Sequence, residues 1–250
     1  MDKLPVYREP KVPTATRRSR KLLLLLLLFF ITILLILFFH SSLSKITRIE
    51  ITGTRFVDPE LVREVSGVRE MDSYFLVWTD RIEDKLRELP EVRRVEAAKK
   101  FPGQLTITVE EYPAVAAELD ADGAVWVVLA NGTQVPADSH PESAMNLPLL
   151  RDWESDPETR LKLCRVLENI PPPLLADVSE IHPDPSVSYP DRIRIYTRSR
   201  FEIITTVSYL PDKLPLMDNI IYSMKQNGHS AGEITMLEGN SSVPFQQLDQ

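Results

Sequence analysis

Side chains able to bind a metal or catalyse a reaction are few in this chain and widely separated. The four histidines, His40, His140, His182 and His229, form neither an HxH nor an HExxH pattern, and no pair of cysteines accompanies them. Metal sites in proteins usually show such close ligand spacing. We therefore expect no metal and no other cofactor.

Adjacent carboxylates at Glu110 and Glu111 are the pair most suggestive of acid–base chemistry, for example on a cell-wall glycan. Both lie in an alternating segment that is predicted to be a strand. Neighbouring side chains of a strand point to opposite faces, so the two groups could not flank one bond. We interpret them as a solvated strand end and predict no catalytic residues.

The single cysteine and the three tryptophans are interpreted from their neighbours. Cys164 is the only cysteine, so no intramolecular disulfide can form, and its apolar helical surroundings predict a small buried hydrophobe. Trp78 and Trp126 have apolar neighbours and are expected in the core. Trp153 lies beside charged residues and is the better candidate for an exposed contact.

A long apolar run near the N-terminus determines where the rest of the chain lies. Leu22–Phe39 is apolar over 18 residues except at Thr32, and such a helix is about 27 Å long, close to the hydrocarbon thickness of a bilayer. Residues 1–21 carry seven basic and two acidic side chains, which predicts a cytoplasmic tail followed by a transmembrane helix at 22–40. A signal peptide cleaved after Ser44 is the alternative.

The charge of the remaining chain excludes one class of partner. Of the 29 Lys and Arg and the 36 Asp and Glu residues, seven and two lie in the tail, so the exported part has a net charge of −12. Nucleic acid binds to basic surfaces. We expect no nucleic acid partner and no small-molecule substrate.

Residues 45–113 carry the signals of a β-α-α-β-β unit. Alternation around Ile49 and Ile51 predicts a strand that Gly53 ends, and Asp58-Pro59-Glu60 predicts the start of a helix. A second helix is expected from Asp80, with Glu83 completing a capping-box-like pair. Two further alternating segments predict a hairpin, so that both helices cover one face of a three-stranded sheet.

Residues 114–240 predict a second, mixed and largely antiparallel β domain, followed by a short tail at 241–250. Strands are expected at 124–129, 178–181, 192–196, 201–207 and 233–237, and helices at 156–168 and 214–226. Asn131-Gly132 is a strong hairpin turn signal, whereas the turn Arg198-Ser199-Arg200 is atypical.

The stretch LPEVRRVEAAKKFPGQLTITVEEYPAVA resembles the signature of the bacterial FtsQ/DivIB cell division proteins. The matching positions are Leu89-Pro90, Phe101-Pro102 and Glu111-Tyr112-Pro113, and the resemblance covers roughly 17–245. It implies an α+β protein with one N-terminal transmembrane helix, a POTRA domain at 45–113 and the β domain. The chain would be a single-pass protein of the cell membrane at the division septum.

The resemblance also implies partners and a site. The partners would be division proteins of the FtsB/DivIC and FtsL type, together with a septal penicillin-binding protein. They would be held at the last strand and its trailing segment, at positions that we carry over one by one: Ile234, Met236, Leu237, Gly239, Val243 and Phe245. An exposed strand edge suits this role, because a partner strand can pair with its backbone.

Two classes of function follow from the sequence. The first is a membrane-anchored scaffold of the division machinery, which is not an enzyme. The alternative is a membrane-anchored extracytoplasmic enzyme acting on the cell wall, which the lack of a nucleophile–base constellation disfavours. A POTRA module serving protein secretion is a weaker variant of the first class.

Overall fold

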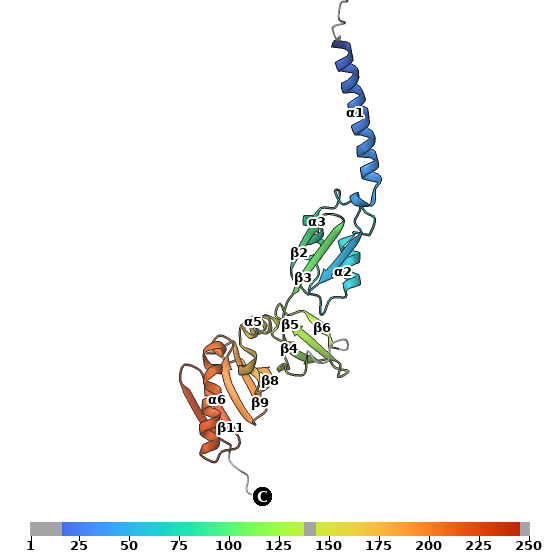
Figure 1. Ribbon diagram of the computed structural model, residues 1–250. Helices are drawn as coiled ribbons and strands as arrows, with labels where there is room; N and C mark the ends of the chain where they lie inside the picture. Colours follow the sequence, from blue (N-terminus) through green and yellow to red (C-terminus); the bar gives the residue numbers. More distant parts are fainter. Residues whose placement is uncertain (1–16, 138–143, 246–250) are drawn as a thin grey trace, which may run out of the picture.

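The computed structural model describes residues 17–137 and 144–245, and it has an elongated shape (Figure 1). Helix α1 (Arg17–His40) comes first and is followed by the 3-10 helix η1 (Ser42–Ser44). Within the described residues, Arg20–His40 is the one stretch long and apolar enough to cross a membrane, and none of it is buried inside the protein. The predicted N-terminal transmembrane helix is thus present as one exposed apolar helix; His140 and residues 1–16 lie outside the described residues.

The unit next to α1 has the predicted β-α-α-β-β order. Its elements are β1 (Arg48–Thr52), α2 (Pro59–Ser66), α3 (Thr79–Leu86), β2 (Val92–Lys100) and β3 (Gln104–Glu111). The sheet order is β1-β3-β2, with β1 parallel to β3 and the β2–β3 hairpin antiparallel. Side chains of both helices meet one face of the sheet in a common apolar cluster. The predicted order of elements in this unit is therefore confirmed.

The start of α3 corrects one prediction. The helix begins at Thr79, and Trp78 occupies the N-cap position without a side-chain cap hydrogen bond. Glu83 does not complete a capping box, because its Oε1 accepts a hydrogen bond from the backbone N–H of Ala97 in β2 at 3.0 Å. The predicted core position of Trp78 is also wrong, since 63% of the residue is exposed.

The second unit is built on a nine-stranded sheet of the described residues. Its strands are β4 (Ala114–Leu119), β5 (Val125–Leu129), β6 (Gln134–Pro136), β7 (Leu149–Leu150), β8 (Val178–Pro183), β9 (Arg192–Thr197), β10 (Phe201–Thr206), β11 (Gly232–Met236) and β12 (Asn240–Pro244). They lie in the order β12-β11-β10-β9-β8-β7-β4-β5-β6, and most neighbours are antiparallel. The predicted mixed, largely antiparallel domain is confirmed.

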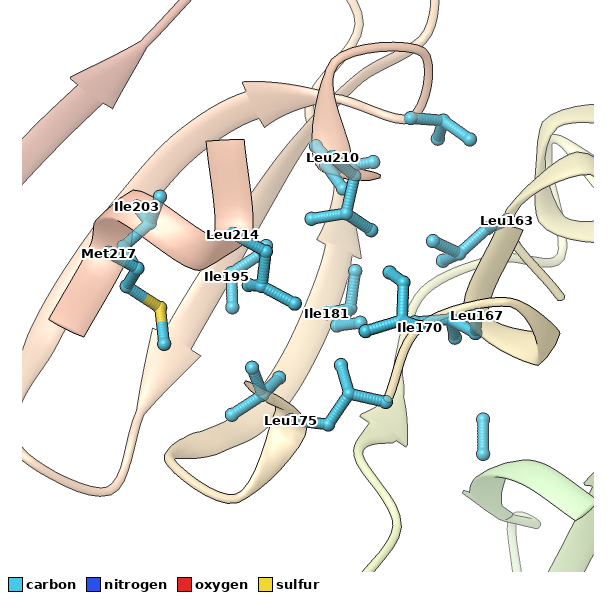
Figure 2. Close-up of a cluster of buried hydrophobic side chains, with 14 of the residues drawn as sticks. Leu163, Leu167, Ile170, Leu175, Ile181, Ile195, Ile203, Leu210, Leu214 and Met217 are labelled. Atoms are coloured by element: carbon cyan, nitrogen blue, oxygen red, sulfur yellow. The ribbon is translucent and has the colours of Figure 1, made fainter. Parts of the chain in front are cut away.

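Two helices complete the core of this unit. Side chains of α5 (Pro157–Glu168) and α6 (Leu210–Gln226) meet those of the strands in one buried cluster, to which the 3-10 helix η3 (Pro172–Leu175) contributes Leu175 (Figure 2). Asp156 caps α5 as predicted, accepting from Thr159 N–H at 3.0 Å. Cys164 is fully buried, and burial raises the pKa of its thiol to about 11, which confirms the small buried hydrophobe.

Three further predictions for this unit are wrong. Helix α6 begins at Leu210, four residues early, because Pro211 suits a first helical turn and Leu210 itself is buried. Trp153 is buried rather than exposed, and its indole N–H donates to Ile181 O at 3.0 Å. Trp126 is half-buried outside the core, where its indole N–H donates to Asp120 at 3.1 Å.

The strand predicted at 233–237 is not the final one. It is present as β11, but β12 follows it after a tight turn and pairs with it antiparallel. The predicted tail from 241 therefore begins inside a strand. All five residues of β12 are exposed, which is why hydrophobic alternation did not reveal it.

Candidate partner-binding edge

Strand β12 lies at one end of the nine-stranded sheet and pairs only with β11 among the described residues. The register sets Gly232 opposite Pro244, Ile234 opposite Ser242 and Met236 opposite Asn240. Because one side of β12 has no neighbouring strand, its outward backbone groups are available to a strand from another protein.

The hydrogen-bond alternation defines which groups face outward. Leu237 N–H donates to Gly239 O at 3.1 Å, and Phe245 N–H donates to Ala231 O at 3.4 Å. In an antiparallel pair every second residue bonds to the neighbouring strand. Because Gly239 and Phe245 bond to the β11 side, Ser241 and Val243 between them also turn their backbone groups toward β11. The outer edge therefore presents the N–H groups of Asn240 and Ser242 and the carbonyls of Asn240, Ser242 and Pro244. Proline has no N–H, so Pro244 limits the length of this edge.

The two faces of the strand pair differ. Ile234 and Met236 are buried against α6, and Asn240 on the same face accepts a hydrogen bond from Lys213 of α6 at 2.9 Å. Val243 lies exposed on the other face, opposite Glu233. A partner strand at β12 would meet Val243 on this face.

The structure divides the six predicted site residues into two groups. Ile234 and Met236 are 0% and 1% exposed, so their side chains hold β11 in place and cannot touch a partner. Leu237 is half-buried, and Gly239 lies in the exposed turn. Val243 and Phe245 are 62% and 44% exposed and point to the same side of the strand. The sequence did not predict the outward groups of Asn240 and Ser242, because it did not predict β12. Gly239, as a turn residue, and Pro244, as a residue typical of edge strands, were the signals that could have indicated it.

The face beside Val243 carries a cross-strand ion network. Arg194 Nη1 lies 2.7 Å from Glu202 Oε2 and 3.5 Å from Glu233 Oε2, and Arg194 Nη2 lies 3.5 Å from Asp184 Oδ2. Burial opposes the charge of Arg194, but the hydrogen bond to Glu202 and the nearby carboxylates outweigh it and raise its pKa. The network lies on the inner strands β9, β10 and β11, and Glu233 is its member opposite Val243 of the edge strand.

The outer strand β2 of the first unit is a less accessible edge. Glu83 of α3 already accepts from Ala97 N–H, and Lys99 of β2 donates to Tyr74 O and Val77 O at 3.0 and 2.7 Å. The protein's own side chains thus cover part of this edge. We therefore favour β12 as the candidate partner-binding site, and the outer edge of β2 is the second candidate.

The carboxylates Glu110 and Glu111 have different surroundings. Glu110 is exposed, and its ion pair with Arg93 is long, with 3.9 Å between Glu110 Oε1 and Arg93 Nε. This is expected for a solvated residue. Glu111 departs from the prediction, because its carboxylate accepts from the backbone N–H groups of Arg55, Phe56 and Val57 at 2.9–3.1 Å. It fixes the loop that leads into α2.

Replacing Glu111 with alanine should therefore lower the free energy of unfolding of this unit by about 2 kcal/mol, because hydrogen bonds to a charged acceptor are lost from three donors. The neighbouring change Glu110→Ala should cost less than about 0.5 kcal/mol, as for an exposed ion pair. Urea unfolding of both variants measures the difference, and equal losses would contradict the structural role of Glu111.

Two short patterns associated with serine nucleophiles lie in unsuitable positions. Gly228–Gly232 reads Gly-x-Ser-x-Gly, but it connects the end of α6 to β11, whereas a nucleophile elbow connects a strand to a helix. Its Ser230 is exposed in that connection. Ser42-x-x-Lys45 spans η1 at the end of the apolar helix.

His182 lies between two carboxylates, a cluster that the sequence did not predict. Its Nδ1 is 2.9 Å from Asp152 Oδ2 and its Nε2 is 2.9 Å from Glu180 Oε2. Both ring nitrogens are thus occupied, which leaves none to act as a base on a substrate. Within the described residues, no group of three or more histidine, cysteine or acidic side chains could hold a metal ion.

An exposed apolar helix, a β-α-α-β-β unit and a sheet with an open edge define a membrane-anchored POTRA protein. Residues 44–112 match the family described as "POTRA domain, FtsQ-type". The cell division protein DivIB of Paenibacillus polymyxa (strain E681) is 43% identical over 232 residues, which cover 93% of this chain and 89% of that protein. The chain belongs to the DivIB family of cell division proteins.

Other relatives are more distant. The cell division protein DivIB of Geobacillus kaustophilus (strain HTA426) is 28% identical over 205 residues, covering 82% of this chain and 77% of that protein. The solved major extracytoplasmic domain of the trans isomer of DivIB from Geobacillus stearothermophilus covers 47% of this chain and 98% of its own, with 24% identity and a TM-score of 0.37. The family match and the 43% identity to the Paenibacillus polymyxa protein identify the chain as a division-related membrane protein.

Proposed function

We propose that this protein is a scaffold of the bacterial division machinery that binds other single-pass division proteins outside the cytoplasm. The observation that carries the proposal is the unpaired outer edge of β12, with Val243 and Phe245 exposed beside it. The partner adds a strand to this edge and belongs to the FtsB/DivIC type, working with an FtsL-type protein. A septal penicillin-binding protein is a further member of the proposed complex.

Recognition by strand addition has two parts. The outward N–H groups of Asn240 and Ser242 and the carbonyls next to them give backbone hydrogen bonds to any strand of suitable length. Selectivity comes from Val243 and Phe245 and from the charge of Glu233, which lies opposite Val243. No bond is made or broken, so the scaffold helps septal wall synthesis by holding its partners together.

The alternative of an anchored wall enzyme has less support. Glu111 is engaged by three backbone donors, Glu110 is solvated, and both nitrogens of His182 are occupied. Glu111 and His182 are thus held in hydrogen bonds within the protein, and Glu110 is a solvated side chain without a second catalytic group beside it.

The proposal places residues 1–21 in the cytoplasm and the folded units outside, at the septum. The basic side chains before α1 favour this orientation. A phosphatase reporter, active only outside the cytoplasm, should be active when fused after Gln250 and inactive when fused before Lys21. The reverse pattern would overturn the orientation.

Replacing Phe245 or Leu237 with glutamate should weaken binding of the FtsB/DivIC-type partner by about 2 kcal/mol, or roughly 30-fold, because a charge would be buried in the interface. Phe245→Glu should leave the melting temperature unchanged, since the residue is exposed, whereas Leu237→Glu should lower it. The measurement is partner affinity and melting temperature of the full chain in detergent.

The matched control is Tyr222→Glu, an exposed aromatic position on α6 with 65% exposure, which should leave affinity unchanged. Unchanged affinity in both edge variants would exclude β12 and move the site to the POTRA unit.

A further inference from the structure

Helix α1 enters the POTRA unit at one end (Figure 1), and segments that meet there carry large exposed apolar side chains. They come from η1, from the connection between α2 and α3, and from the β2–β3 turn: Leu43 (48% exposed), Met71 (64%), Phe75 (46%), Leu76 (74%), Trp78 (63%) and Phe101 (53%). We call this set the apolar rim. On soluble proteins, so many large exposed apolar side chains close together usually mark a binding site.

The rim is attached directly to the end of α1. The ring of Phe75 lies 5.9 Å from that of Phe38 and 6.0 Å from that of Phe39, the last aromatic residues of the helix. Ser44 Oγ donates to Phe39 O at 2.7 Å, and Tyr74 N–H donates to Ser44 O at 2.9 Å. These contacts fix the depth of the rim relative to the helix.

The length of α1 places that depth at the surface of the membrane. The apolar run Leu22–Phe39 is about 27 Å long as a helix, slightly less than a hydrocarbon core of about 30 Å. Both ends of the run, including Phe38 and Phe39, must then lie at the boundary between acyl chains and headgroups. Phe75, in contact with both rings, lies at the same level.

We propose that the apolar rim inserts into this boundary, so that the POTRA unit binds the lipid surface around α1. Trp78 and the phenylalanines suit the interface, where aromatic side chains are enriched in membrane proteins. Lys45 and Lys100 lie beside the rim in sequence and can reach headgroup phosphates. Lipid is the occupant because it is what surrounds the end of a spanning helix.

Hydrogen bonds and ring contacts connect the rim to strand β2 and to the β2–β3 turn. Lys99 donates to Tyr74 O and Val77 O at 3.0 and 2.7 Å, and its ammonium lies 5.0 Å from the Tyr74 ring centre. The ring of Tyr74 in turn lies 5.9 Å from that of Phe101. The POTRA unit thus has a second attachment to the membrane besides α1, which restricts its tilt and the direction in which it holds the rest of the chain.

Tryptophan emission tests the proposal in the full chain, placed alone in phosphatidylcholine nanodiscs with or without bromine on the acyl chains near the headgroup. Trp126 and Trp153 belong to the second unit, beyond the POTRA unit (Figure 1). Brominated lipid should quench part of the emission of the wild type, and Trp78→Phe should lose that quenchable part. Equal quenching of the two proteins would overturn the proposal.

A nitroxide label gives a second measurement. Leu76→Cys and the control Tyr222→Cys place labels at two exposed positions, and Cys164 stays unlabelled because it is buried. The label at 76 should be accessible to oxygen and shielded from a water-soluble nickel chelate, and the label at 222 should be fully accessible to the chelate. Equal chelate access at both, or shielding at 76 only after another membrane protein is added, would overturn lipid binding.

Discussion

Replacing Ser242 with proline should weaken binding of the FtsB/DivIC-type partner by about 3 kcal/mol or more, roughly 150-fold, without unfolding the sheet. The alternation along β12 turns the N–H of Ser242 outward, so its own pairing with β11 does not use that group. Proline removes one of two outward donors and sets a ring in the path of the incoming strand. Pro244 already occupies the next position of the same kind in this strand.

The neighbouring change Ser241→Pro is the matched control. Ser241 lies opposite Thr235, and its N–H faces β11, so proline there breaks the protein's own ladder. Ser241→Pro should therefore lower the melting temperature and the affinity together, whereas Ser242→Pro should lower affinity alone. Affinity by titration calorimetry and melting by circular dichroism separate the two effects. Wild-type affinity of Ser242→Pro would show that the partner does not pair with β12.

The parts of the fold that the sequence predicts are those with local signals. Asp58 accepts from Glu60 N–H at 2.8 Å, and Gly67 ends α2 in the left-handed conformation. Asn131-Gly132 forms the predicted turn between β5 and β6, with Gly132 at φ 86°. Each of these signals depends on residues within one turn of the chain, so no knowledge of the packing is needed to read them.

The parts that the sequence does not predict depend on distant residues. Trp153 is buried because β8 supplies Ile181 O as a partner for its indole, 28 positions away. The atypical turn Arg198–Arg200 is accommodated because Asp177 accepts from both the backbone N–H and the hydroxyl of Ser199. Charged neighbours in the sequence suggested that Trp153 is exposed, and the turn at 198–200 lacks a usual turn sequence. In both places a contact from another element explains the observed structure.

The candidate site was partly predictable for a related reason. A strand with one buried face shows alternating hydrophobicity, as β11 does at Ile234 and Met236. An edge strand that is exposed on both faces has no such pattern, and Asn240–Pro244 reads as a loop. The exposure that makes β12 available to a partner is therefore also the reason why the sequence does not predict this strand.

Replacing Gly53 with alanine should lower the free energy of unfolding of the POTRA unit by about 3 kcal/mol or more. Gly53 follows β1 with φ +85°, and a Cβ atom built on it would lie 2.1 Å from Val109 O, a backbone atom of β3. The backbone of β3 cannot rotate away as a side chain could. Alanine must therefore separate β1 from β3, which breaks the parallel pairing that ends at Thr52 and Thr108.

Gly67→Ala is the control in the same unit, since it carries a similar backbone strain without the collision. Its φ is +69°, and an added Cβ would meet only the flexible end of Lys85, at 3.0 Å. The strain alone should cost about 1 kcal/mol. Hydrogen exchange by mass spectrometry on the full chain localises the loss, and amides of β1 and β3 should exchange faster in Gly53→Ala. Similar losses for both variants would mean that β1 and β3 can separate at little cost, and that the close approach of Gly53 to Val109 does not hold the sheet together.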